Sequence, residues 1–249
     1  MKKSVFENVA VFLIAWLLRI FIPFRWRVTC DNLERLYPKK EAKKVAWQSY
    51  LHHARLLVYI PKLKKVVNTK RIRINDPDHF DAMLQQERVF MFSGHVGLWE
   101  LVPFVLNKYN LEKQNWLYKH SRVEFLDRLL YRYRQLPGIQ TWDSLTQLKE
   151  ALRSFKNEGH LGMASDQGAG YQAEFFGKIK KFPIGSQKLV QRYQVPCYFF
   201  SCMYRDDEII VYTKPLGIDS FQDDYIKTLE AVIKQYPEQY YWMHRIWKA

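Results

Sequence analysis

The alternation of apolar and polar positions divides the chain into strand-like and helix-like segments. Strand-like segments occur at 71–74, where charged and apolar residues alternate, and at 89–92, 114–119, 139–142, 160–165, 195–203 and 208–213. Segments with apolar residues at helical spacing lie at about 41–59, 78–86, 98–107, 125–134, 145–157, 185–193 and 223–235. This order predicts a single α/β domain in which helices flank a central, mostly parallel or mixed sheet.

The N-terminal segment, residues 1–27, has a different pattern. Lys2 and Lys3 precede an apolar run that Arg19 interrupts, and further arginines close the segment. A membrane-spanning helix needs about 20 consecutive apolar residues, and this run is shorter. No small-residue cleavage site follows it. We therefore expect an uncleaved membrane-anchoring helix at 1–27, interfacial or shallowly inserted, with a buried helix as the alternative.

Charge narrows the choice of partner. The 249 residues include 39 Lys and Arg against 25 Asp and Glu, a formal net charge of +14. This excess indicates an anionic partner. Because no nucleic-acid-binding motif is present and aromatic residues make up 16% of the chain, a membrane surface is favoured over nucleic acid. Three cysteines without paired close spacing argue against a disulfide framework or zinc site and favour a reducing compartment.

The strongest chemical candidate follows the apolar run at 89–92. His95 falls in the expected strand-to-helix turn, and Glu100 falls in the first turns of the helix. A carboxylate beside a histidine fixes its tautomer and raises its basicity, as a general base requires. Gly94 and Gly97 allow a substrate to approach the backbone, and the helix start offers N–H groups to an oxyanion. The alternative is a solvated histidine in a turn.

Three later segments contain further candidates. Arg134 lies four residues before Gly138, where it either satisfies carbonyls at a helix end or belongs to a site. Asp166 and Gln167 follow a strand directly, so they form either a tight turn or a site at the sheet edge. Near the end of the chain, His244 is expected to be a packed imidazole, and Arg245 is a candidate for holding an anionic group.

Four ordered blocks resemble one protein family. The segment from Gly94 to Glu100 resembles its G-H-x-G-N-W-E signature, with Leu98 in place of the usual Asn. The others are Arg134…Gly138, Asp166-Gln167 followed by Phe175-Phe176-Gly177, and Pro237 to Lys248. The chain thus resembles the bacterial lipid A biosynthesis lauroyl/myristoyl acyltransferases, a branch of the wider lysophospholipid acyltransferase-like group with a His-x4-Glu/Asp motif. It is shorter than typical members.

The resemblance implies an enzyme at the cytoplasmic face of the bacterial inner membrane, with an anchor at 1–27 and an acyltransferase domain at 28–249. The implied donor is acyl–acyl carrier protein, and the acceptor is a hydroxyl of a lipid A precursor among anionic membrane lipids. No metal, cofactor or nucleic acid is expected. In the mechanism expected here, His95 is the base and Glu100 orients it. Backbone N–H groups from Gly94 to Leu98, with Arg134, bind the oxyanion, and Asp166 holds Arg134 or the acceptor.

Several alternatives stay open at this point. The donor is either acyl carrier protein or coenzyme A. The acceptor could instead be a lysophospholipid or an aminolipid, and a thioesterase would pass the acyl group to water. A non-catalytic basic protein that binds membranes is the alternative from another class.

Overall fold

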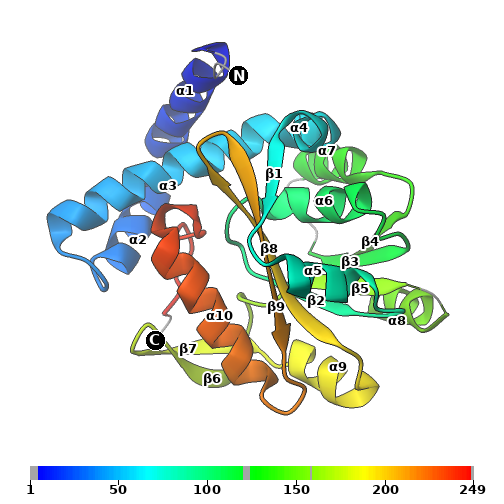
Figure 1. Ribbon diagram of the computed structural model, residues 1–249. Helices are drawn as coiled ribbons and strands as arrows, with labels where there is room; N and C mark the ends of the chain where they lie inside the picture. The colour runs from blue at the N-terminus through cyan, green and yellow to red at the C-terminus, as the bar shows by residue number, and fades with distance from the viewer. Residues whose placement is uncertain (1–4, 120–123, 158, 248–249) are drawn as a thin grey trace.

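A seven-stranded sheet forms the centre of the protein in the computed structural model, which describes residues 5–119, 124–157 and 159–247 (Figure 1). The strand order is β1-β9-β8-β2-β5-β3-β4, and β8–β9 is the one antiparallel neighbour pair among these described strands. The strands are β1 Arg71–Ile74, β2 Phe90–Ser93, β3 Gln114–Tyr118, β4 Ile139–Asp143, β5 His160–Ala164, β8 Cys197–Arg205 and β9 Glu208–Leu216. The predicted α/β fold with a mostly parallel sheet is confirmed.

Helices cover both faces of this sheet. They are α1 Val5–Phe21, α2 Pro23–Leu33, α3 Lys39–Tyr59, α4 Leu63–Thr69, α5 Pro77–Leu84, α6 Val102–Lys108, α7 Glu124–Arg134, α8 Leu148–Asn157, α9 Gly185–Tyr193 and α10 Phe221–Gln235. Short 3-10 helices are η1 Ile60–Lys62, η2 Trp99–Leu101 and η3 Pro237–Gln239. The apolar residues of α8, α9 and α10 pack on one face, and those of α4, α5 and α6 pack on the other. Lys2, Lys3 and Lys248 lie outside the described residues.

Alternation along β8 shows how one strand serves both layers. Cys197 and Phe199 contribute to the core under α10, whereas Tyr198, Phe200 and Cys202 contribute to the opposite core. Successive side chains of a strand point to opposite faces, so the continuous apolar run indicates a strand that is buried on both sides. Cys197 and Cys202, an odd number of positions apart, therefore face opposite sides of the sheet.

Register at the centre of the sheet positions the candidate site. The parallel strands β2 and β5 are neighbours, and Ser93 pairs with Ala164. His95 and Asp166 therefore each lie two residues beyond a matched pair of strand ends. Because the carboxyl ends of parallel strands meet at one edge of a sheet, the two side chains come together there.

A two-stranded antiparallel hairpin stands beside this edge, apart from the main sheet. It consists of β6 Gly170–Phe175 and β7 Lys178–Pro183. The hairpin follows directly on the Asp166 loop, so its position affects the residues at the end of β5.

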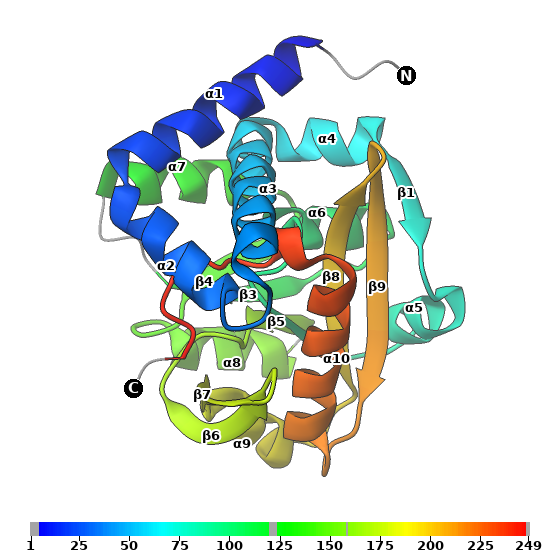
Figure 2. The same ribbon diagram turned by 90° about the vertical axis from the view of Figure 1, so that its left-hand side faces the viewer.

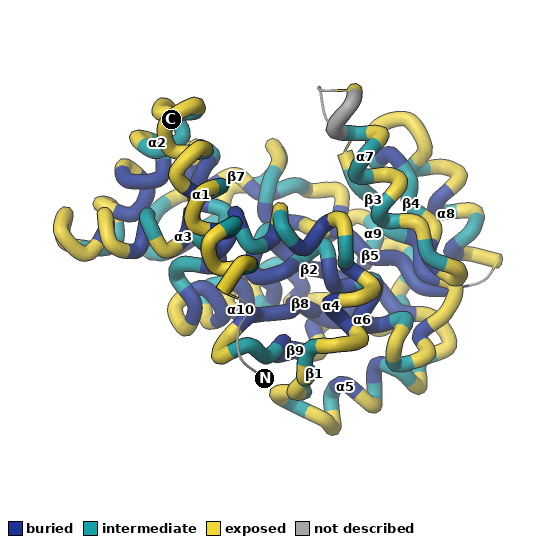
Figure 3. The backbone as a smooth tube through the Cα atoms, turned by 90° about the horizontal axis from the view of Figure 1, so that it is seen from above, coloured by how far each residue is buried: buried dark blue, intermediate teal, exposed yellow. Residues whose placement is uncertain are grey.

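Helices α1 and α2 lie outside the sheet layers and meet at an angle of 97° (Figure 2). Val11 and Ala15 of α1 are buried against α3, and Ile14 and Leu18 are partly buried beside them. Most other apolar residues of α1 are exposed, and α1 is largely exposed in Figure 3. Within the described residues, no single helix has the length and apolarity to cross a membrane, although the bent pair meets both criteria together. The predicted boundary between residues 27 and 28 falls inside α2.

Candidate active site

His95 and Asp166 form the central pair of the site. His95 Nδ1 lies 2.7 Å from Asp166 Oδ1; the Asp166 side chain is fully buried, and that of His95 is 31% exposed. An ionised carboxylate can only accept a hydrogen bond, so Nδ1 of His95 carries the proton and donates it. This leaves Nε2 as the basic nitrogen of the imidazole.

Electrostatics in the pair favour the charged forms of both groups. Burial lowers the pKa of His95, but the charge and hydrogen bond of Asp166, together with the charge of Glu100, outweigh burial and raise it. Burial raises the pKa of Asp166, yet the charge and hydrogen bond of His95 and the charge of Lys180 hold it well below its usual range. The carboxylate is therefore ionised at neutral pH.

The structure gives Glu100 a different partner from the one that its spacing suggests. Arg134 at the end of α7 donates from Nε to Glu100 Oε2 at 2.9 Å and from Nη2 to Oε1 at 2.7 Å. The two side chains are 18% and 12% exposed. The sequence led us to expect contacts from Glu100 to His95 and from Asp166 to Arg134. The structure exchanges the partners: Asp166 pairs with His95, and Glu100 pairs with Arg134. Glu100 acts on His95 only through its charge.

The crossed pairing has a physical cause. Residues 99–101 form a 3-10 helix, and α6 begins only at Val102, so the expected helix at 98–107 starts late. A bidentate guanidinium–carboxylate pair is geometrically demanding and strong when it is buried. Glu100 therefore meets the planar fork of Arg134, while the carboxylate of Asp166 lies beside His95.

Two of the expected oxyanion donors are already bound within the protein. The N–H of Gly97 donates to the carbonyl oxygen of Gln239 at 2.8 Å, and the N–H of Leu98 donates to that of Cys202 at 2.6 Å. Gly97 has φ +67°, and an added Cβ would overlap the Cys202 carbonyl. Gly97 and Leu98 therefore attach the loop to β8 and to the C-terminal segment and do not supply an oxyanion hole.

The C-terminal segment holds the His95 loop from the other side. Val96 and Tyr240 form a β-bridge, and the N–H of Tyr241 donates to the carbonyl oxygen of His95 at 2.9 Å. His244 stacks on Tyr241, with ring centroids 5.7 Å apart, and burial lowers the pKa of His244 to about 4. His244 is thus a packed neutral imidazole, as expected from the sequence.

The remaining sequence candidates are Gly94, Gln167 and Arg245. Gly94 is so close to Leu229 and Asp166 that it leaves little room for a side chain. Gln167 has a buried Nε2 without a hydrogen-bond partner among the described residues. Arg245 is exposed.

Sequence reasoning missed the aromatic surroundings of His95. The rings of Trp99 and Tyr241 lie 5.6 and 6.3 Å from that of His95. Both rings also contact the ring of His53 of α3, with centroids 5.6 and 5.3 Å apart. Nε2 of the neighbouring His52 lies 3.0 Å from the carbonyl oxygen of Gly97. The signal available was a pair of histidines on the apolar side of the helix at 41–59, next to Ala46, Tyr50 and Ala54.

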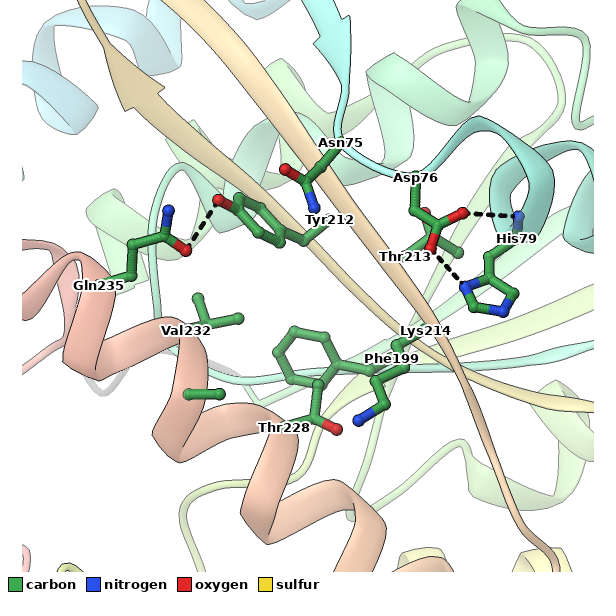
Figure 4. Close-up of a pocket in the computed structure, with 11 residues that line it drawn as sticks. Asn75, Asp76, His79, Phe199, Tyr212, Thr213, Lys214, Thr228, Val232 and Gln235 are labelled. Atoms are coloured by element: carbon green, nitrogen blue, oxygen red, sulfur yellow. Dashed lines mark hydrogen bonds and ion pairs between the residues drawn. The ribbon is translucent and has the colours of Figure 1, made fainter.

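A separate cavity of about 270 Å³ lies between α5, β9 and α10 (Figure 4). It contains a second histidine–carboxylate pair, His79 Nδ1 to Asp76 Oδ2 at 2.7 Å. None of the predicted site residues lines this cavity. The pair at 76–79 therefore provides an internal comparison for the pair at the sheet edge.

The fold and the His95–Asp166 pair together define an α/β protein with a histidine–carboxylate pair at the carboxyl edge of its sheet. Residues 4–249 match the model of the family described as bacterial lipid A biosynthesis acyltransferase. The chain belongs to this family and is an acyltransferase.

One solved structure is similar over most of the chain. It is the 1-acyl-sn-glycerophosphate (LPA) acyltransferase PlsC from Thermotoga maritima, at 13% sequence identity and a TM-score of 0.42. The match covers 93% of this chain and 94% of that one. No curated protein gave a significant match.

Proposed function

We propose that the protein transfers a fatty acyl group from acyl–acyl carrier protein to a hydroxyl of a lipid A precursor, with His95 as general base. One observation carries the proposal. The imidazole is partly exposed, and the ionised, fully buried carboxylate of Asp166 fixes its Nδ1 at 2.7 Å. A histidine held in this way presents Nε2 as a base of defined tautomer.

In the proposed reaction, Nε2 of His95 takes the proton of the acceptor hydroxyl. The oxygen then attacks the thioester carbonyl and forms a tetrahedral oxyanion. Collapse of this intermediate breaks the carbon–sulfur bond, and the leaving thiolate takes the proton back from the imidazolium. Asp166 stabilises the imidazolium between these steps. A positioned general base contributes about 10²–10⁴ in rate.

Glu100 and Arg134 have a different part in this scheme. Two N–H groups of the guanidinium bind Glu100, which fixes the orientation of the remaining N–H groups of Arg134. We assign Arg134 to an anionic group of the substrate or to the oxyanion, and Glu100 to positioning Arg134. Gln167 supplies an amide for the substrate, whereas the space beside Gly94 is filled by Leu229. The exposed Arg245 is a further anion contact.

The same proposal places the enzyme on the cytoplasmic face of the inner membrane. The side of α1 that points away from α3 exposes large apolar side chains, including Phe6 at 83% and Phe21 at 75%. A helix with one apolar face and flanking cations lies in the membrane interface. The net charge of +14 supports contact with anionic lipids and with an acidic carrier protein.

The test compares His95→Ala with His79→Ala, which removes the histidine of the second pair. Acyl transfer from acyl–acyl carrier protein is measured in membranes that contain the lipid A precursor. His95→Ala should lower the rate by about 10² or more, and His79→Ala should leave it near that of the natural protein. Equal rates for both variants would remove His95 from the mechanism.

Product analysis in the same assay separates the alternatives. If the transferred acyl group is found in a lysophospholipid or an aminolipid rather than in the lipid A precursor, that lipid is the acceptor. Free fatty acid formed without any acceptor would indicate a thioesterase. If acyl–coenzyme A supports the reaction and acyl–acyl carrier protein does not, the donor is acyl–coenzyme A.

A further inference from the structure

Strand β7 places an apolar side chain outside and a charged one inside. Ile179 is 61% exposed, whereas the next residue, Lys180, is 3% exposed. Lys181 is exposed, and Phe182 is fully buried. The sequence predicts Lys178, Lys180 and Lys181 as one basic edge, and for Lys180 this prediction is wrong.

The register of the hairpin holds this inverted arrangement in place. Ala173 of β6 pairs with Lys180, and Tyr171 pairs with Phe182. A shift by one residue would bury Ile179 and Lys181 and expose Lys180 and Phe182, because side chains alternate between the two faces. Either register buries one lysine, and burial of the larger Phe182 favours the observed register. This register places Lys180 inside, where specific contacts must stabilise its charge.

Those contacts lead to the candidate site. Nζ of Lys180 donates to the carbonyl oxygen of Asp166 and, at 3.2 Å, to that of Lys181. The ammonium lies 3.6 Å from the centroid of the Phe182 ring. Both hydrogen-bond acceptors are main-chain carbonyls rather than carboxylates. Burial lowers the pKa of Lys180 to about 8, and the charge of Asp166 opposes this effect.

The buried hydroxyl of Tyr240 lies near the Asp166 carboxylate. Oδ2 of this carboxylate is buried and makes no hydrogen bond of normal geometry within the described residues. Its Oδ1 is bonded to His95, the group that it would orient. The N–H of the preceding residue, Ser165, donates a hydrogen bond to the carbonyl oxygen of Ser93 at 2.8 Å. The main-chain bond from Lys180 is therefore the contact that fixes the Asp166 peptide from the hairpin side.

We propose that Lys180 is a positioning residue: its buried ammonium holds the Asp166 main chain so that the carboxylate stays aligned with Nδ1 of His95. This inference rests on the proposed role of His95 as a base. It makes the β6–β7 hairpin part of the active-site architecture.

The test uses Lys180→Met, which keeps the length of the side chain and removes its N–H groups and charge. Lys181→Met is the matched control, because it removes an exposed lysine from the same strand. Steady-state kinetics should show kcat lowered by about 10- to 100-fold for Lys180→Met with little change in KM. Lys181→Met should match the natural protein in both constants.

A second readout does not depend on acyl transfer. The pKa of His95 is measured by NMR of histidine-labelled protein, and the His95→Ala spectrum identifies its signal. If Lys180 positions Asp166, the carboxylate moves away from His95 in Lys180→Met, and the pKa of His95 falls. If Lys180 supplied charge alone, loss of a nearby cation would raise that pKa. A lower pKa in a variant without reduced thermal stability supports positioning.

Several results would overturn the proposal. They are an unchanged or raised pKa of His95, a kcat within about twofold of the natural value, and an equal loss in Lys181→Met. If Lys180→Met does not fold, Lys180→Ala is judged by the same criteria. Failure of both to fold beside a folded Lys181→Met would show that Lys180 serves stability instead. Inactivity of the natural protein in the transfer assay would count against the proposed function and leave the NMR result to decide on Lys180.

Discussion

Replacement of Asp166 by Asn is the sharpest test of the site geometry. The change keeps the size of the side chain and removes the charge that lies 2.7 Å from His95 Nδ1. The amide can also turn its N–H₂ toward Nδ1, which would move the imidazole proton to Nε2. In that tautomer Nε2 cannot accept the proton of the acceptor hydroxyl. Both effects reduce catalysis.

The expected size of the loss follows from the contact. With 2.7 Å between the nitrogen and the oxygen, the two charge centres are about 4 Å apart, and at an effective dielectric constant of about 20 their attraction is about 4 kcal/mol. If this stabilises the imidazolium only in the transition state, its loss lowers the rate by about 10³. The wrong tautomer adds to this loss, so we expect kcat/KM to fall by about 10³ or more.

The pH dependence gives a second and independent sign. His95 must be neutral to act as base, so activity rises with pH through the pKa of His95. Asp166 raises that pKa in the natural protein. Asp166→Asn should therefore move the acid limb of the rate profile to lower pH while the plateau falls.

The assay is acyl transfer measured across the range in which His95 titrates. Asp206→Asn is the control, because it removes a carboxylate whose side chain is 90% exposed in the turn after β8. An acid limb that stays in place or moves to higher pH in Asp166→Asn would refute the pairing of Asp166 with His95. A plateau within about tenfold of the natural rate would refute its mechanistic importance.

Two further predictions concern the Glu100–Arg134 pair and helix α1. Arg134→Met leaves the nearly buried Glu100 carboxylate unpaired and should lower the free energy of unfolding by about 3–5 kcal/mol. The double variant with Glu100→Gln should recover part of this loss, as urea unfolding measures. Purely additive losses would contradict a coupled pair. Leu13→Asp with Leu17→Asp, at positions 55% and 50% exposed on α1, should weaken binding to anionic vesicles at least about tenfold without lowering the melting temperature. Leu145→Asp, at a position 72% exposed outside α1, is the control, and an equal loss in it would contradict a role for α1.

Apolar patterning predicted the layers of the fold but not the order of its strands. Runs such as 89–92 and 195–203 indicate strands buried on both faces, because each successive side chain finds an apolar layer. The same runs carry no information about which strand lies beside which. The parallel pairing of β2 with β5 joins segments about 70 residues apart, with Phe90 beside Leu161. Such pairing is set by tertiary packing rather than by local propensity.

In the candidate site, too, the sequence predicted a local feature but not a contact between residues far apart in the chain. His95 could be predicted because a histidine follows directly on a buried strand and a glycine. Its partner could not, because spacing along the chain describes local geometry, and Asp166 lies 71 positions away. One signal was nevertheless present. Asp166 also follows two residues after an apolar run, so adjacent parallel strands would place both residues at the same level.

Lys180 shows why a binary pattern fails at a particular kind of position. Ile179 and Phe182 are three positions apart in one strand, so alternation can bury only one of them. The structure buries Phe182, and Lys180 on the same face donates to the main chain of Asp166. A protein that exposes an apolar residue and buries a charge gives up stability at that point, and such exceptions are expected near functional sites. The buried charge at Lys180 is therefore a signal, independent of the His95 motif, that the Asp166 loop belongs to the site.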